Sequence, residues 1–175
     1  MEEQYKNISS SNPIELNGND LTINDLHKIA YQNNVVKLSD ESVSKILVCR
    51  KMVEDKINEG EIVYGINTGF GALVSQRISP DDLAQLQVNL IRSHACAIGE
   101  PMSREDSSAM MCVRANSLAK GCSGIQRVVL EQLVAFLNAD IVPIIPRIGS
   151  LGASGDLAPL SHMALALIGE GEVWG

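Results

Sequence analysis

The chain has 175 residues, of which 45% are hydrophobic and 20% are charged. This is an ordinary composition for a globular protein that is long enough to bury one core. Its formal charge of −7 argues against binding to phosphate backbones or anionic membranes, because both need clustered Lys and Arg. No apolar stretch approaches the ~18 residues that a membrane span requires, so neither nucleic acid nor a membrane is an expected partner.

The N-terminal residues and the cysteines predict the compartment. The sequence MEEQYK is acidic and polar where a secretory signal needs a basic start and an apolar run. The four cysteines show no CxxC spacing and have no His at metal-ligand intervals: Cys49, Cys96, Cys112 and Cys122. We expect a cytoplasmic protein with free thiols and without a metal site.

The N-terminal elements are predicted from composition and capping signals. Residues 1–20 are rich in Asn and Ser and are expected to form a flexible tail with one short strand at 14–16. Thr22 and Asp25 have the spacing of a capping box, which predicts a helix to about residue 32. An ordered domain is therefore expected to begin at about residue 21 and to run to residue 175.

Two elements and a loop are expected next. Apolar residues at helical spacing predict a second helix, which should follow the first at once and run from residues 39–41 to Gly60. The β-forming residues of the segment 61–64 predict a short strand. This strand would lead into the glycine-rich loop 65–71, GINTGFG.

Cap residues predict three further helices. A Ser-Pro-Asp-Asp start predicts a helix over 79–93, and Ser103 opens another that ends at Gly121. Ser123 and Gln126 form a second capping box before an apolar stripe, which the sequence places at these positions: Ile125, Val129, Leu133, Phe136 and Leu137.

The last part of the chain is predicted to be a loop followed by a helix. Pro143 and Pro146 interrupt the helical pattern, and the loop should extend to Gly152. The final helix is expected over 157–167. The architecture is thus mainly α, with several helices, short strands and a Gly-rich loop before the last helix.

The segment Gly149–Asp156, GSLGASGD, is the part of the sequence that carries chemistry. Its plainest interpretation is a flexible turn with Asp156 as an N-cap. A phosphate loop lacks its lysine and its glycine spacing here, and Ser154 does not have the spacing of a GxSxG nucleophile.

A third chemistry, backbone cyclisation, suits the residues Ala153, Ser154 and Gly155. The amide nitrogen of Gly155 can attack the carbonyl carbon of Ala153, because glycine has no Cβ to block the approach and alanine is small. Loss of the Ser154 hydroxyl as water then leaves an exocyclic methylidene.

The segment Gly149–His162, GSLGASGDLAPLSH, resembles the signature of the histidine and phenylalanine ammonia-lyase family. Two other segments resemble motifs of the same family in the same order, namely 63–71, VYGINTGFG, and 86–95, LQVNLIRSHA. The resemblance implies the N-terminal region of the ammonia-lyase fold. Residues 21–175 would be its MIO-bearing domain, truncated before a central helical bundle.

The resemblance also implies the catalytic residues. Ala153, Ser154 and Gly155 would form the prosthetic group 4-methylidene-imidazol-5-one (MIO), and no external cofactor would be needed. Tyr64 matches the tyrosine that acts as the base at the β-carbon of the substrate. Asp156 matches the acid after the triad, and we expect it to cap the last helix and to hold the triad compressed.

Four further residues match the substrate side of the family's site. Gly71 and Leu157 match positions that line the pocket, although a turn glycine and a core leucine explain them equally well. Ser93 and His94 match the Ser-His pair of members that act on histidine, and an imidazole suits a polar ring. Ala97 departs from the family pattern, which has glycine there, and this departure weakens the argument for histidine.

The implied function is the deamination of L-histidine to trans-urocanate and ammonia by a full-length homotetramer. A phenylalanine or tyrosine ammonia-lyase and an aminomutase stay open as alternatives, because the deciding residues lie beyond this sequence. The 175-residue chain alone is expected to be inactive. A catalytically silent chain that acts only as a folded module is the alternative of another class.

Overall fold

The computed structural model describes residues 12–68, 80–152 and 155–174. Six helices lie in these ranges: α1 (Ile23–Gln32), α2 (Asp40–Asn58), α3 (Pro80–His94), α4 (Arg104–Leu118), α5 (Arg127–Asn138) and α6 (Leu157–Leu167). The strands are short: β1 (Ile14–Leu16), β2 (Val36–Leu38), β3 (Ile98–Pro101), β4 (Val142–Pro143), β5 (Pro146–Ile148) and β6 (Val173–Trp174). The predicted mainly α architecture is confirmed.

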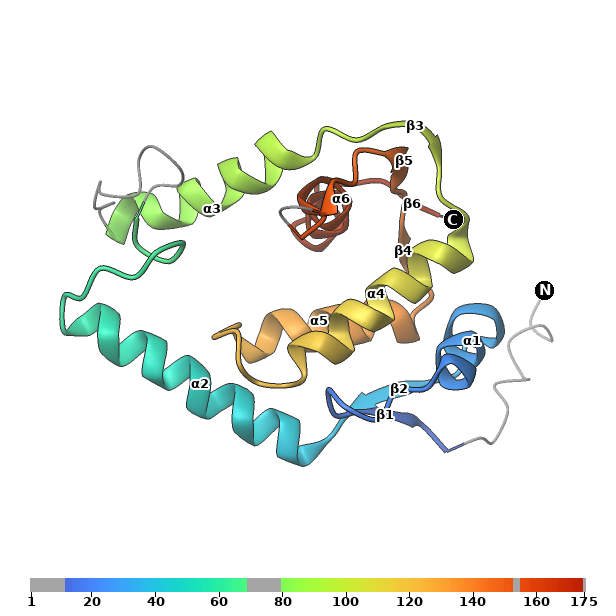
Figure 1. Ribbon diagram of the computed structural model, residues 1–175, viewed down its shortest axis with the longest axis horizontal. Helices are drawn as coiled ribbons and strands as arrows, with labels where there is room; N and C mark the ends of the chain where they lie inside the picture. Colours follow the sequence, from blue (N-terminus) through green and yellow to red (C-terminus); the bar gives the residue numbers. More distant parts are fainter. Residues whose placement is uncertain (1–11, 69–79, 153–154, 175) are drawn as a thin grey trace.

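The core lies around α4, which packs against α1 on one side and α5 on the other (Figure 1). Its fully buried side chains come from helices and strands alike: Leu16, Ile46, Met111, Leu130, Val142 and Ile145. A second helix pair, α3 and α6, packs together. No helix in the described ranges combines the length and the apolar composition that a bilayer span needs.

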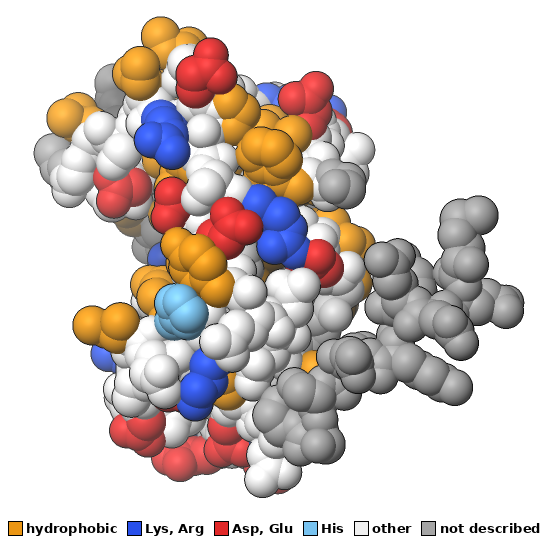
Figure 2. Space-filling view, turned by 90° about the vertical axis from the view of Figure 1, so that its right-hand side faces the viewer, with side chains coloured by type: hydrophobic (Ala, Val, Ile, Leu, Met, Phe, Trp, Pro, Cys, Tyr) orange, Lys and Arg blue, Asp and Glu red, His pale blue; other side chains and the backbone are white. Residues whose placement is uncertain are grey.

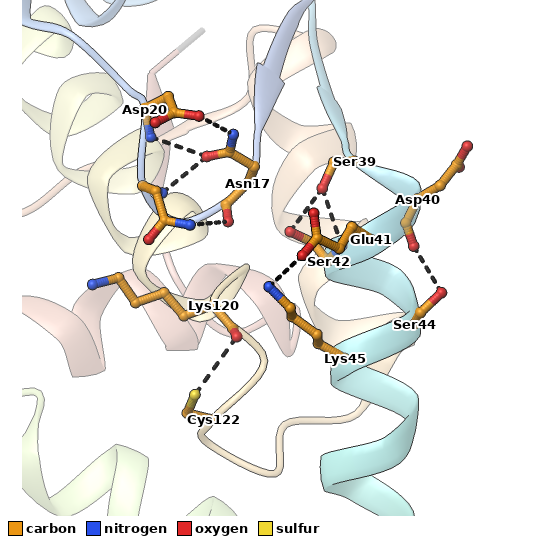
Figure 3. Close-up of polar contacts among 11 residues, drawn as sticks. Asn17, Asp20, Ser39, Asp40, Glu41, Ser42, Ser44, Lys45, Lys120 and Cys122 are labelled. Atoms are coloured by element: carbon orange, nitrogen blue, oxygen red, sulfur yellow. Dashed lines mark hydrogen bonds and ion pairs between the residues drawn. The ribbon is translucent and has the colours of Figure 1, made fainter.

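The first helices form where the cap residues predict them. Thr22 and Asp25 make both hydrogen bonds of the capping box at α1, and the Ser39 hydroxyl accepts the amide of Ser42 at the start of α2 (Figure 3). The expected tail contains β1, and Leu16 in this strand is fully buried. The second helix does not follow the first at once, because β2 lies between them and pairs in parallel with β1.

The amide of Asn138, at the end of α5, completes this small sheet. Its Oδ1 accepts the backbone N–H of Val36 at 2.8 Å, and its Nδ2 donates to the carbonyl of Val36 at 2.9 Å. A side chain thus replaces a third strand beside β2.

Gly121 turns the chain after α4, as predicted, although the helix itself ends at Leu118. Gly121 has a φ of +73°, and a Cβ there would lie 2.5 Å from the Cβ of Lys45. Figure 3 shows Lys45 on α2 facing the connection that carries Lys120 and Cys122. This close approach brings α2 onto the loop between α4 and α5.

Three further predicted features of the fold are wrong. The first is the strand at 61–64, where no regular structure forms and Tyr64 lies in a turn. The side chain of Asn67 accepts the N–H of Val63 at 2.8 Å and donates to the carbonyl of Glu61 at 2.8 Å. These bonds take the backbone groups that a strand partner would need.

The second wrong prediction is the capping box of α5. The N-cap is Gln126, and no side chain caps the helix. Of the predicted apolar stripe, only Val129 is exposed: Leu133 is buried in the core, and Ile125, Phe136 and Leu137 pack against it. The other buried residues of α5 are Leu130 and Val134. The buried positions have the i, i+3, i+4 spacing of a helix face.

The third wrong prediction is the loop over residues 143–152. β4 and β5 form there, and they pair antiparallel with β6 and β3. Proline is tolerated because both ladders have only two strands, so a missing N–H can face away from the partner. The last helix begins and ends where predicted, at Leu157 and Leu167.

The surface charges of one face are mixed in sign. Figure 2 shows the side of the molecule that lies on the right in Figure 1, where Lys and Arg side chains are scattered among acidic and apolar ones. Charges of opposite sign also alternate along α2, where they form i, i+4 ion pairs such as Lys45–Glu41 and Lys51–Asp55.

The four cysteines are free, and burial raises the pKa of the Cys112 thiol to about 12.

Candidate functional site

The ladder between β3 and β5 brings two of the three motifs together. Ile98 is opposite Ile148 in this antiparallel pair, so the next position along each strand sets Ala97 against Gly149. A Cβ built on Gly149 would lie 2.7 Å from the Cβ of Ala97. The segment that follows Ser93 and His94 therefore touches the first residue of the triad loop.

The triad itself falls partly outside the described residues. Ala153 and Ser154 are not described, whereas Gly155 lies in a turn with a φ of +78° and has open space where a Cβ would be. Asp156 also has a positive φ, of +59°. Two successive left-handed residues give the chain a sharp bend directly after Ser154.

Contrary to the prediction from the sequence, the side chain of Asp156 does not cap α6. It occupies the N-cap position, but its side chain makes no cap hydrogen bond. Its left-handed backbone departs from the extended conformation of an N-cap, and its Oδ1 instead accepts a hydrogen bond from the hydroxyl of Ser150. This bond joins the residues on either side of 151–155 and so closes the loop across the triad.

A pocket of about 340 Å³ lies beside this loop. Three of its lining residues belong to the triad segment and the start of α6, and three come from β3's end and α4: Ser150, Asp156, Pro159, Met102, Asp106 and Met110. β5 adds Pro146 and Arg147, so the lining combines apolar side chains with the carboxylates of Asp106 and Asp156 and the guanidinium of Arg147. No cluster of His, Cys, Asp and Glu suited to a metal ion occurs among the described residues.

Ser93 and His94 end α3, and their side chains bond to each other. His94 Nδ1 lies 2.8 Å from the carbonyl oxygen of Leu90 and 3.0 Å from Ser93 Oγ, and Ser93 Oγ lies 3.0 Å from the same carbonyl. Because a carbonyl only accepts, we assign the imidazole proton to Nδ1. In the neutral ring Nε2 is then a hydrogen-bond acceptor.

The remaining predicted residues are more scattered. Tyr64 is 62% exposed in a turn after α2, and the described part of this connection, residues 59–68, lies apart from α6 in Figure 1. Leu157 is the first residue of α6 and is 46% exposed. Gly71 lies outside the described residues. The structure thus joins the Ser-His segment to the flank of the triad, and it places Tyr64 on a separate loop.

Sequence reasoning gave no role to His162 or to the ion pair of Arg92. His162 Nε2 accepts the backbone N–H of Ala97 at 3.2 Å, and burial lowers the pKa of this imidazole, which favours the neutral, accepting form. Arg92 donates from Nε and Nη2 to both carboxylate oxygens of Glu170. The signal in the sequence that pointed to His162 was its place as the last residue of the triad signature. Its partner Ala97 lies 65 positions earlier, so the sequence did not reveal the contact.

Sequence comparison connects this geometry to known enzymes. A histidine ammonia-lyase of Geobacillus thermodenitrificans is 54% identical over 160 residues, which are 91% of this chain and 32% of that protein. Another, from Halalkalibacterium halodurans, is 52% identical over 159 residues, again 91% of this chain and 31% of that protein. The chain spans about a third of the length of these curated relatives.

Solved structures show the same fold. Tyrosine aminomutase from Streptomyces globisporus superposes with a TM-score of 0.88 at 36% identity, over 94% of this chain and 31% of that one. Histidine ammonia-lyase from Trypanosoma cruzi gives 0.83 at 39% identity, over 93% and 30%. The family model of the aromatic amino acid lyases matches residues 21–175. The chain therefore belongs to the aromatic amino acid lyase family.

Proposed function

We propose that the full-length protein is a histidine ammonia-lyase that converts L-histidine to trans-urocanate and ammonia. The observation that carries this proposal is the Ser93–His94 pair, whose hydrogen bonds leave His94 Nε2 as an acceptor. An imidazole ring offers an N–H to such an acceptor, whereas a phenyl ring offers none. Curated relatives that are just over 50% identical in sequence and are named histidine ammonia-lyase give independent support.

The residues around the triad fit an MIO group. The bend at Gly155 and Asp156 and the open space at Gly155 suit the close approach of its amide to the Ala153 carbonyl. The bond between Ser150 and Asp156 closes the loop from outside, which supports the proposed role of Asp156 in compressing the triad. Such a group would supply an electrophilic carbon for the substrate amine and so make that amine a better leaving group.

The chain's own residues would then bind and position the substrate. We infer that His94 and Ser93 hold the ring, that Gly71 and Leu157 line the pocket, and that Tyr64 removes the β-proton. The phenolic oxygen of Tyr64 must come within about 3 Å of that proton's carbon for the transfer. Positioning of this kind is the main contribution a protein makes when a prosthetic group carries the chemistry.

The proposal also covers the organisation of the protein. Residues 21–175 would form the N-terminal MIO-bearing domain of a cytoplasmic homotetramer. Within the tail proposed for residues 1–20, β1 pairs with β2 of this domain and Leu16 is buried in its core. Since the chain spans about a third of its relatives, we propose that it does not turn over substrate by itself. Light scattering of the full-length protein tests the tetramer.

The experiment that tests the substrate compares L-histidine, L-phenylalanine and L-tyrosine with the full-length enzyme. Wild type should release urocanate and ammonia, and a site built for a polar ring should reject phenylalanine by ~10⁴-fold when its polar group is fully buried. His94→Leu should lower kcat/KM for histidine and leave intact mass unchanged apart from the substitution. The exposed histidine of α1 gives a matched control, His27→Leu.

Two results would contradict this proposal. If wild type prefers phenylalanine or tyrosine, or returns the amine to the β-carbon as an aminomutase does, the substrate or reaction is wrong. If His94→Leu turns histidine over as wild type does, the role of the Ser-His pair is wrong.

A further inference from the structure

We propose that His162 and the Arg92–Glu170 ion pair are positioning residues that hold the Ser93–His94 segment in register with the triad. This inference rests on the proposed function, in which Ser93 and His94 contact the substrate ring. It assigns a role to three side chains that are not part of the triad.

The first anchor acts just after the Ser-His pair. Ala97 is 9% exposed, and its N–H donates to His162 Nε2 on α6 at 3.2 Å. The side chain of Ala97 packs beside Gly149, where an added Cβ would lie 2.7 Å away. Ala97 therefore contacts both flanks of the triad, the loop that leads into it and the helix that follows it.

The second anchor acts just before the Ser-His pair. Arg92 forms a two-pronged ion pair with Glu170, which lies three residues after the end of α6. An Arg–carboxylate pair of this geometry fixes orientation as well as distance. Both side chains of this pair are exposed to solvent, so the pair contributes orientation more than stability. Ser93 and His94 are thus held on one side by α6 and on the other by the turn that follows it.

The chemistry of the first anchor is specific. A buried N–H without an acceptor is unfavourable, so loss of the imidazole should let residues 95–97 move toward another partner. The imidazole accepts only in its neutral state, and burial lowers the pKa of His162 in the direction that keeps it neutral. A glutamine at this position can present its amide oxygen near the site of Nε2, whereas leucine cannot.

The test uses the full-length enzyme with His162→Leu, His162→Gln and the matched control His27→Leu. Because a displacement of about 1 Å can cost ~10²-fold in rate, His162→Leu should lower kcat/KM for histidine by about ten- to a hundredfold, with a raised KM. Its intact mass should equal wild type apart from the substitution. His162→Gln should recover most of the loss, and His27→Leu should match wild type.

The ion pair provides a second, independent test if His162→Leu does not fold. Arg92→Glu should raise KM for histidine, and the exchange Arg92→Glu with Glu170→Arg should restore it to within a few-fold of wild type. A purely structural role would lower the melting temperature and the yield of active enzyme without changing KM.

The inference is overturned if His162→Leu and Arg92→Glu keep the wild-type KM, or if His162→Gln is as impaired as His162→Leu. These outcomes require a wild type that turns over histidine. A wild type that does not act on histidine would overturn the proposed function instead, so the two failures are distinguishable.

Discussion

At the scale of single residues, the contact between Ala97 and Gly149 determines how closely the two motif-bearing segments approach. Gly149 has no side chain, and the Cα of Ala97 lies 2.9 Å from the place where a Cβ would be. A backbone atom cannot rotate away as a flexible side chain does. The position therefore requires glycine for reasons of space.

Gly149→Ala should destabilise the chain by about 1–3 kcal/mol, the usual cost of forcing extra atoms into a packed region. Gly152→Ala in the same loop is the control, since no atom of the described residues lies within 4 Å of its added Cβ. It should change stability by less than ~0.5 kcal/mol. Urea unfolding of both variants measures the difference. Equal stabilities would mean that the loop shifts freely and that the contact does not hold it.

Residue types and the resemblance to the lyase signature predict the triad, which stays a prediction, but they do not predict the conformation of its neighbours. Ala153, Ser154 and Gly155 are recognisable because their chemistry depends on which atoms each residue has. Asp156 was expected to be a helix cap, since Asp before a helix usually is one. Its left-handed backbone and its bond with Ser150 depend on the surrounding loop, which residue type does not encode.

At the scale of elements, helices with local start signals were predictable and paired strands were not. The cap of α2 illustrates the first case, because Ser39 lies three residues from the amide that it accepts. β3 and β5 illustrate the second, because they pair across about 50 positions and contain Pro101 and Pro146. No local pattern in either strand identifies its partner, and proline argues against a strand.

Ser39→Ala should cost about 1 kcal/mol, because it leaves an amide of the first turn of α2 without its acceptor. Ser39 is buried, so water cannot replace the hydroxyl. Ser44→Ala is the matched control on the same helix: its hydroxyl only donates back to the carbonyl of Asp40, and alanine is the better helix former. Thermal unfolding should rank Ser39→Ala below both wild type and Ser44→Ala, and the reverse order would contradict the cap.

At the scale of the whole molecule, the fold brings together segments that are far apart in the sequence. The α3–α6 packing and the β3–β5 ladder place the Ser-His segment beside the triad flank. The described part of the connection between α2 and α3, which contains Tyr64, lies apart from α6 in Figure 1. The sequence motifs predicted which segments carry the chemistry. Their arrangement follows from long-range contacts, such as His162 with Ala97, that only the folded chain reveals.

The intact mass of the full-length protein tests the central claim, the MIO group, most directly. Ring closure between Gly155 and Ala153 releases one water molecule, and loss of the Ser154 hydroxyl releases another. We predict a mass lower than the sequence demands by two water molecules. Ser154→Ala has no hydroxyl at this position to lose, so its mass should not show this two-water deficit. An unmodified mass in a soluble, folded wild-type preparation would contradict the account.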